Sequence, residues 1–254
     1  MKLQLWRNAT IQLKIHNTRF LIDPMLGHKA SLGEFPWTED GQKNPLVDLP
    51  FTDEELIEAL EVIDAVVVSH LHPDHWDKAA VMLLEQSKRI YCPEKLIQAI
   101  RSFGFTNVRE ITDPLAHDNI SIHVTDGQHG QGEIGEKMGE VKGFVFEYMN
   151  QRIYIAGDTI WCDEVKAAID QYQPAHIIVA GGAATFAMGS PVTMTFEDIE
   201  ALCAYTKKAK VWVTHLESIS PCTQDRKFIN QAIENSGLKG RCRVLEDGEE
   251  VDLI

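Results

Sequence analysis

The sequence predicts an α/β protein of the α+β kind, in which helices cover β-sheets. Apolar runs of strand length alternate with helical patterns, and both halves of the chain contain both kinds of element. No linker or low-complexity segment interrupts the 254 residues, 44% of which are hydrophobic. A chain of this size and composition can bury a large core, and we expect residues 1–254 to form a single domain.

The N-terminal part begins with three short strands. Turn residues Asn8 and Asn17 separate them, which indicates an antiparallel meander. A long irregular stretch from Gly27 to Pro50 follows, and loops of this length in a domain are usually functional or disordered. Its Phe35 and Trp37 suggest either a wall or lid over a substrate or a surface that packs against another subunit. The expected strands are Leu3–Arg7, Thr10–Ile15 and Arg19–Ile22.

Helix boundary signals mark the rest of the chain. Thr52 opens a helix, because Glu55 three residues later completes a capping box. Pro93 suits the first turn of a later helix, which stops near Gly104. The other expected elements are strands Ile63–Ser69, Ile120–Thr125, Gly143–Tyr148, Arg152–Ala156, His176–Ala180 and Val211–Thr214, and helices Trp76–Gln86, Asp163–Gln171, Thr195–Lys207 and Asp225–Asn235, the last ending at Gly237.

Composition excludes several classes of protein. With 24 basic and 38 acidic side chains the formal charge is −14, and no basic block occurs, so we expect a small-molecule substrate and no nucleic acid. No apolar run is long enough for a membrane span, and the N-terminus lacks the features of a secretion signal. The five cysteines have no CxxC pair and are expected to be reduced, so we predict a cytoplasmic protein, with a homo-oligomer possible.

The segment from His70 to His75, His-Leu-His-Pro-Asp-His, carries the strongest chemical signal. Three histidines and one aspartate within six residues are too polar for a core and too rich in histidine for an ordinary turn. Pro73 stiffens the segment and lowers the entropy cost of holding ligands. Taken alone, the segment could also be a solvated turn or an adventitious metal site.

Potential metal ligands also follow three further strands. Three of the expected strands are followed within four residues by His129, Asp158 and His215, and another runs into His70. If these strands point the same way, their ligands converge at one edge, where α/β folds tend to place active sites. Imidazole and carboxylate suit zinc, iron or manganese, and the residues alone give no strong preference among these metals.

The order HxHxDH, a lone His, an Asp after a strand and a late His resembles the metallo-β-lactamase superfamily over essentially the whole chain. Finer features resemble its branch of ascorbate-6-phosphate lactonase-like metal-dependent hydrolases. These features are Phe20-Leu21-Ile22-Asp23-Pro24, Ile155-Ala156-Gly157-Asp158-Thr159, Pro191-Val192-Thr193-Met194-Thr195 and His215-Leu216-Glu217. The resemblance implies an αββα sandwich of two mixed, mostly antiparallel sheets flanked by helices.

The resemblance also implies a ligand set for two divalent ions, with zinc as the first candidate and manganese or iron as alternatives. One ion would be held by His70, His72 and His129, and the second by Asp74, His75 and His215. Asp158 would bridge the two ions. One departure is that the segment Ser220-Pro221-Cys222 lacks a histidine that many relatives carry before the cysteine.

The site predicts a hydrolase that uses a metal-bound hydroxide, and the resemblance to lactonase-type relatives implies a small ester, lactone or phosphoester as substrate. Bound divalent ions bring the pKa of water toward roughly 7, and Asp74 would orient the nucleophile and accept its proton as the catalytic residue. Asp23 is either an acceptor for a ligand histidine or a turn residue before Pro24. No G-x-S-x-G elbow offers a serine nucleophile.

Other functions and residues stay open at this stage. The alternatives are a phosphodiesterase acting on cyclic nucleotides or phospholipids, redox chemistry on iron, and a non-catalytic metal-stabilised binding protein.

The glycine-rich stretch Gly127–Gly143 could shape the site around His129, or form a hairpin tip. Gly181 and Gly182 are expected to allow close packing near the metals. Five histidines lie outside the pattern, namely His16, His28, His117, His123 and His176, and among them only His28 is considered for the pocket.

Overall fold

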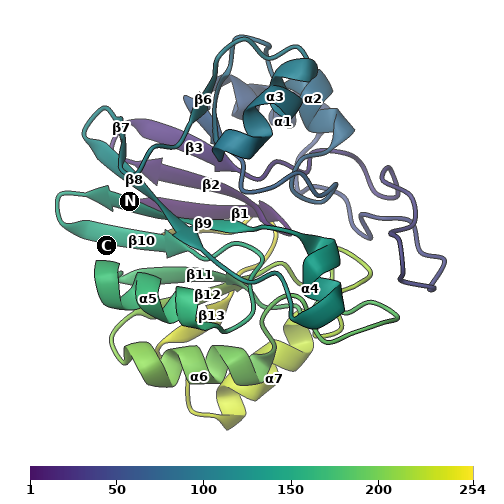
Figure 1. Ribbon diagram of the computed structural model, residues 1–254, viewed down its shortest axis with the longest axis vertical. Helices are drawn as coiled ribbons and strands as arrows, with labels where there is room; N and C mark the ends of the chain where they lie inside the picture. The colour runs from purple at the N-terminus through teal and green to yellow at the C-terminus, as the bar shows by residue number, and fades with distance from the viewer. Residues whose placement is uncertain (254) are drawn as a thin grey trace.

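Residues 1–253, which the computed structural model describes, form two seven-stranded sheets that face each other, with helices on the outer faces (Figure 1). The strand order is β14-β1-β2-β3-β4-β5-β6 in the first sheet and β13-β12-β11-β10-β9-β8-β7 in the second. The expected four-layer αββα sandwich is therefore confirmed. The first sheet contains β1 (Lys2–Arg7), β2 (Thr10–Ile15), β3 (Thr18–Ile22), β4 (Ala65–Val67), β5 (Arg89–Cys92), β6 (Val108–Glu110) and β14 (Glu250–Asp252), and the second contains β7 (Leu115–His117), β8 (Ile120–Asp126), β9 (Lys142–Tyr148), β10 (Gln151–Ile155), β11 (His176–Ala180), β12 (Lys210–Thr214) and β13 (Cys242–Val244).

Each sheet divides evenly between antiparallel and parallel pairing. The predicted meander of β1, β2 and β3 is confirmed, and β14 extends it with another antiparallel pair. From β3 to β6, and from β10 to β13, neighbouring strands are parallel. The sheets are therefore mixed as expected, but not mostly antiparallel. The reason is that helices connect most of these later strands, and such crossovers place successive strands parallel.

One hydrophobic core lies between the two sheets. Alternate side chains of each strand point inward and pack against the facing sheet, as the period of two requires. Phe20 of the first sheet contacts Phe146 of the second, with ring centroids 5.2 Å apart. This shared core also includes Leu3, Leu5, Leu13, Phe144, Ile178 and Trp212.

Each sheet is covered on its outer face by three helices. The first sheet packs against α1 (Asp53–Glu61), α2 (Lys78–Leu83) and α3 (Ile97–Ser102). The second packs against α5 (Asp163–Tyr172), α6 (Phe196–Thr206) and α7 (Arg226–Asn235). The predicted capping box at the start of α1 is confirmed, because Thr52 accepts from the backbone of Glu55 while Glu55 accepts from Thr52.

Some elements differ from the sequence prediction. The helix expected from Trp76 is the shorter α2, because Asp77 caps it at Lys78. The helix expected from Pro93 is split into a 3-10 turn, η1 (Glu94–Leu96), and α3. Five short strands were not predicted, because they hold only three or four residues each, too few to show an alternation; these are β5, β6, β7, β13 and β14.

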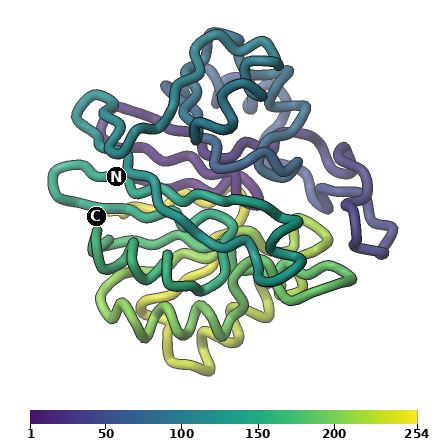
Figure 2. The backbone as a smooth tube through the Cα atoms, viewed as in Figure 1, coloured from purple at the N-terminus to yellow at the C-terminus, as the bar shows by residue number. Residues whose placement is uncertain are grey.

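Two further regions were expected to be irregular. The glycine-rich stretch contains a helix, α4 (Gly132–Met138), and is not a plain hairpin tip. The long segment 27–50 has no helix or extended strand and projects from the body of the molecule (Figure 2). It is held by the fully buried Arg7, whose guanidinium donates to the carbonyls of Met25, Gly27 and Val47. Across residues 1–253, no helix is both long and apolar enough to cross a bilayer.

Candidate metal centre

Three strands of the second sheet deliver candidate ligands to the same edge. β8 and β10 both run antiparallel to β9, and β10, β11 and β12 are parallel, so β8, β10 and β12 point the same way. His129, Asp158 and His215 follow their C-terminal ends. β4 of the facing sheet leads to His70. The predicted convergence of strand ends is therefore confirmed.

His70, His72 and His129 form one group. One ring nitrogen from each lies within 4.8 Å of the others. The ring centroid of His72 is 4.5 Å from that of His70 and 5.2 Å from that of His129. His70 and His129 are buried, and His72 is partly exposed to the cavity described below.

Asp74, His75, Asp158 and His215 form a second group, all of them buried and again with ligand atoms within 4.8 Å of one another. Asp74 Oδ2 lies 3.1 Å from His215 Nε2 and 3.6 Å from His75 Nε2. Asp158 Oδ2 lies 3.1 Å from His75 Nε2 and 3.2 Å from His215 Nε2. The two groups together bring all seven sequence-predicted ligands into one place.

Asp158 lies between the two groups. Its Oδ2 atom is 3.9 Å from His129 Nε2 in the first group, besides its contacts with His75 and His215 in the second. Its other oxygen, Oδ1, is buried without a hydrogen-bond partner among the described residues. The Asp158 carboxylate therefore contacts imidazoles of both groups and keeps one oxygen unsatisfied, so it could bind a cation in either group.

Neighbouring groups fix the tautomers of three histidines. His75 Nδ1 donates to Asp23 at 3.0 Å, and His129 Nδ1 donates to the carbonyl of Val192 at 2.9 Å. The Ser69 hydroxyl donates to Asp23, so it accepts from His70 Nδ1 at 2.8 Å. With a proton on each Nδ1, the Nε2 atom of each ring is the one directed to the centre.

The residues fit a metal on physical grounds. Two buried atoms, His70 Nε2 and Asp158 Oδ1, have no hydrogen-bond partner within residues 1–253. Buried polar atoms are rarely left unsatisfied, and a cation between them would satisfy both. Neutral imidazole and ionised carboxylate are donors that divalent zinc, iron or manganese accept.

The pKa directions describe the charge balance among these side chains. Burial lowers the pKa of His70 and lowers that of His129 to about 4, so both rings are neutral. Burial alone would raise the pKa of Asp158, but the charges of His215 and His75 outweigh it and hold the carboxylate ionised. Burial opposes a rise in the pKa of His75, but the carboxylates of Asp158 and Asp74 outweigh it and raise this pKa to about 10, so the ring is protonated at neutral pH and has to give up a proton to bind a cation through Nε2.

The histidines outside the pattern lie away from both groups. His28 does not line the cavity, because its side chain is exposed and faces Asp53 at 3.5 Å. His117 is buried against Tyr91, and His123 pairs with Asp113. His176 accepts from the indole of Trp212.

Two contacts near the centre were missed from sequence. Asn8, interpreted as a turn residue, donates to Asp74 Oδ2 at 3.2 Å. Cys222 lies with its sulfur 3.5 Å from His215 Nδ1, on the segment that lacks the additional histidine. Gly182 is required there, because a Cβ would come within 2.4 Å of the carbonyl of His215 and 2.5 Å of Cys222 Sγ. The predicted close packing of Gly181 and Gly182 is confirmed.

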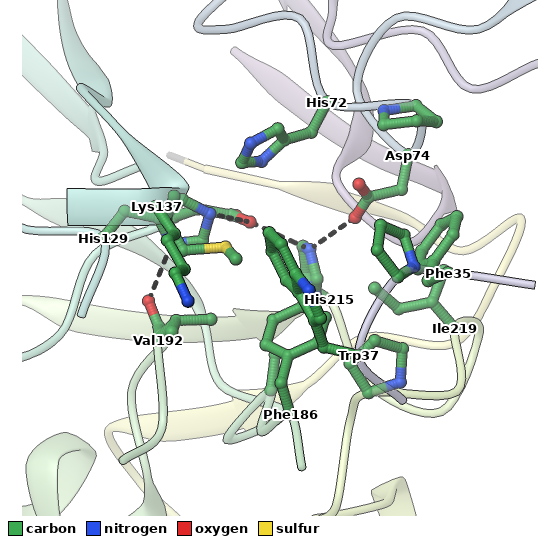
Figure 3. Close-up of a pocket in the computed structure, with 16 residues that line it drawn as sticks. Phe35, Trp37, His72, Asp74, His129, Lys137, Phe186, Val192, His215 and Ile219 are labelled. Carbon is green, nitrogen blue, oxygen red and sulfur yellow. Dashed lines mark hydrogen bonds and ion pairs between the residues drawn. The ribbon is translucent and has the colours of Figure 1, made fainter. Parts of the chain in front are cut away.

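A cavity of about 230 Å³ opens onto both groups (Figure 3). Segment 27–50 supplies Phe35 and Trp37 to its wall, in line with the interpretation of this segment as a wall, and packing against another subunit stays a prediction. Apart from five residues of the two groups, its lining is apolar with the exception of Lys137. The apolar lining consists of Phe35, Pro36, Trp37, Pro73, Met138, Ala184, Phe186, Val192, Ile219 and Pro221.

Comparisons with known proteins agree with the fold and with a metal-dependent hydrolase. The family model described as beta-lactamase superfamily domain matches residues 18–216. The UPF0173 protein YddR from Bacillus subtilis is 34% identical over 247 residues, covering 96% of both chains. A UPF0173 metal-dependent hydrolase from Ignicoccus hospitalis is 24% identical over 193 residues, which are 74% of this chain and 78% of its own.

Two solved structures are similar over the full length. An isothiocyanate hydrolase from Delia radicum gut bacteria has a TM-score of 0.93 and 32% identity, and the match covers 100% of this chain and 99% of that one. A possible metal-dependent hydrolase from Veillonella parvula has a TM-score of 0.94 and 30% identity with the same coverage. The narrower resemblance to the lactonase branch stays a prediction. The chain belongs to the beta-lactamase superfamily and is a metallo-hydrolase of the metallo-β-lactamase fold.

Proposed function

We propose that this protein hydrolyses a small, uncharged, apolar electrophile at a centre of two divalent metal ions. His70, His72 and His129 would hold one ion, Asp74, His75 and His215 the other, and Asp158 both. The observation that carries the proposal is a pair of adjoining His and Asp groups at the floor of an otherwise apolar cavity. Zinc is the first metal to test, with manganese and iron as alternatives.

The residues of the centre divide the chemical work. Divalent ions held there would lower the pKa of a bound water toward roughly 7 and so supply hydroxide at neutral pH. Asp74 is the proposed catalytic residue, because its carboxylate lines the cavity and is ionised. Burial raises the pKa of Asp74, but the charges of His75 and His215 outweigh this effect and lower it. An ionised carboxylate can orient the attacking water by accepting its hydrogen bond, and we propose that Asp74 also takes the proton of this water.

The cavity favours neutral substrates over phosphoesters. Lys137 is the single basic residue of the lining apart from histidines, and Glu133 pairs with its ammonium at 2.9 Å. Its charge is thus already balanced, and the remaining wall offers hydrophobic contact rather than hydrogen bonds to an anion. Esters and lactones therefore fit better than cyclic nucleotides or phospholipid head groups.

Isothiocyanates are a second substrate class, suggested by the similar hydrolase from Delia radicum gut bacteria. They are neutral and apolar, and their central carbon is electrophilic. Addition of water across the C=N bond places hydroxyl on carbon and a proton on nitrogen. The resulting thiocarbamic acid then breaks its C–N bond, and the products are an amine and carbonyl sulfide.

The test combines metal analysis with a substrate panel. The panel consists of 2-phenylethyl isothiocyanate, p-nitrophenyl acetate, a γ-lactone and bis(p-nitrophenyl) phosphate. We expect two metal ions per chain and a higher kcat/KM for at least one neutral substrate than for the phosphodiester, with activity lost on chelation. Faster cleavage of the phosphodiester, or full activity without metal, would contradict the proposal.

The remaining expectations also belong to this proposal. The core shared by the two sheets supports a single domain from residue 1 to 254. The five cysteines are unpaired in the described chain, which supports a reducing location such as the cytoplasm. We propose a small-molecule substrate as the partner, and neither nucleic acid nor a membrane. Self-association is testable by light scattering.

A further inference from the structure

We infer that Phe35, Trp37 and Phe186 form an aromatic wall that selects substrates carrying an aryl or arylalkyl group. The inference rests on the proposed function, because it names which neutral electrophiles the centre would favour. The three rings come from two segments that are far apart in the sequence, and they line the same cavity as His72, Asp74 and His215. Figure 3 shows Trp37 and Phe186 near each other beside these polar groups.

The geometry of the wall suits a ring. The Trp37 and Phe186 centroids are 6.3 Å apart with an interplanar angle of 82°, which is an edge-to-face arrangement. Such pairs have positive edges and negative faces, and a further ring can add to them in the same geometry. Phe35 and Phe186 are half-buried, and Trp37 remains 43% exposed. Covering exposed apolar surface of this kind with a hydrophobic group removes it from water, which makes a favourable contribution to the binding free energy.

The backbone holds the wall in place at a conformational cost. Trp37 has a φ of 63°, which bulky residues rarely adopt. Its carbonyl accepts a hydrogen bond of 2.7 Å from the backbone of Ala187, next to Phe186. This bond ties the two segments together and sets the spacing of the two rings. An unfavourable backbone angle kept at a cavity wall is consistent with a binding role for this side chain.

Segment 27–50 is itself fixed to the body close to the centre. The buried Asn44 accepts from the backbone of Ser220 at 2.8 Å and donates to its hydroxyl at 3.2 Å. The backbone of Leu46 donates to Ser218, three residues after His215. The wall is therefore positioned relative to the candidate ligands before any substrate arrives, which reduces the entropy cost of binding.

The experiment uses the zinc-loaded full chain and two metal-binding probes that differ in a ring, acetohydroxamic acid and 3-phenylpropionohydroxamic acid. Calorimetry would give the ratio of their dissociation constants for the wild type, Phe186→Ala, Phe186→Leu and Trp37→Ala. Phe228→Ala is the matched control, because this exposed phenylalanine of α7 does not line the cavity. Hydrolysis of methyl and 2-phenylethyl isothiocyanate would be measured in parallel.

We expect the wild type and the Phe228 variant to bind the phenyl probe about tenfold more tightly than the acetyl probe. Trp37→Ala and Phe186→Ala should lose most of this ratio through the phenyl probe alone, and Phe186→Leu should lose less. A wild-type ratio near one, or equal weakening of both probes in the variants, would overturn the inference. Retained probe selectivity without any hydrolysis would refute the proposed function and not the aromatic wall, whereas hydrolysis without selectivity would do the reverse.

Discussion

The carboxylate of Asp23 accepts a hydrogen bond from Nδ1 of His75 at 3.0 Å, while Nε2 of the same ring points to the candidate metal centre. Asp23 also accepts from the backbone and the hydroxyl of Ser69. Through Ser69 the same carboxylate orients His70. One buried aspartate thus fixes two candidate ligands, one in each group, which resolves the ambiguity between an acceptor and a simple turn residue.

Asp23→Asn should weaken metal binding at both groups. The amide cannot accept from His75 and Ser69 as the carboxylate does, so the ring tautomers are no longer fixed, and affinity should fall by roughly 10- to 100-fold. Competition with a chromophoric zinc chelator would measure the change. Asp163→Asn, at an exposed position in the first turn of α5, is the control and should bind zinc like the wild type. Equal affinity of both variants would remove the orienting role of Asp23.

Asp158→Ala should abolish hydrolysis and reduce the bound metal to about half or less, because one carboxylate would serve both ions. Elemental analysis after gel filtration would give the stoichiometry. Asp126→Ala offers a matched control, since Asp126 is exposed, pairs with Lys142 and belongs to neither group. Full metal content in the Asp158 variant would exclude the bridging assignment.

Cys222 should be replaceable by serine but not by alanine. Its thiol lies 3.4 Å from the carbonyl of His215 and 3.5 Å from Nδ1 of the same residue, so a hydroxyl can make both contacts. We expect Cys222→Ser to keep its zinc affinity within about twofold and Cys222→Ala to lose several-fold, because a ligand orientation is lost. The same chelator competition would be used, and two variants with identical affinity would show that the sulfur has no such role.

Arg7→Met should destabilise the protein and loosen segment 27–50. Burial lowers the pKa of Arg7 to about 10, against the opposing charge of Asp77, so the guanidinium is charged at neutral pH. Its loss leaves three carbonyls without a donor, at a cost of about 3 kcal/mol or more. Urea unfolding would measure the cost, and KM should rise more than kcat falls. An unfolding free energy equal to that of the wild type would contradict this account.

His117 should make stability depend on pH. Burial against Tyr91 lowers its folded-state pKa below the ordinary value, with Asp118 opposing the shift. The unfolded chain therefore binds more protons, so this contribution is present above about pH 6.5 and is lost as the pH falls below it. Urea unfolding at about pH 7.5 and about pH 5.5 should show a smaller difference for His117→Gln than for the wild type. An equal or larger difference in the variant would contradict the prediction.

Helices and strands were predictable where local sequence signals are strong. The capping residue Thr52 and the alternating strands of the meander were correct, because each depends on neighbours in sequence. The short strands β5 and β13 were not, since three or four residues carry too little pattern and owe their conformation to the strands beside them.

The sequence alone determined which side chains could bind metal, because the spacing of His70 to His75 and the strand ends at His129, Asp158 and His215 are local properties of the chain. Tertiary structure alone decided which atoms face the candidate metal centre, since the contacts of Asp23, Ser69 and Val192 with the candidate ligand rings join distant segments. It also decided the character of the cavity. Phe186 meets Trp37 only because a hydrogen bond between two loops, formed across 150 residues of chain, brings their rings to the same wall.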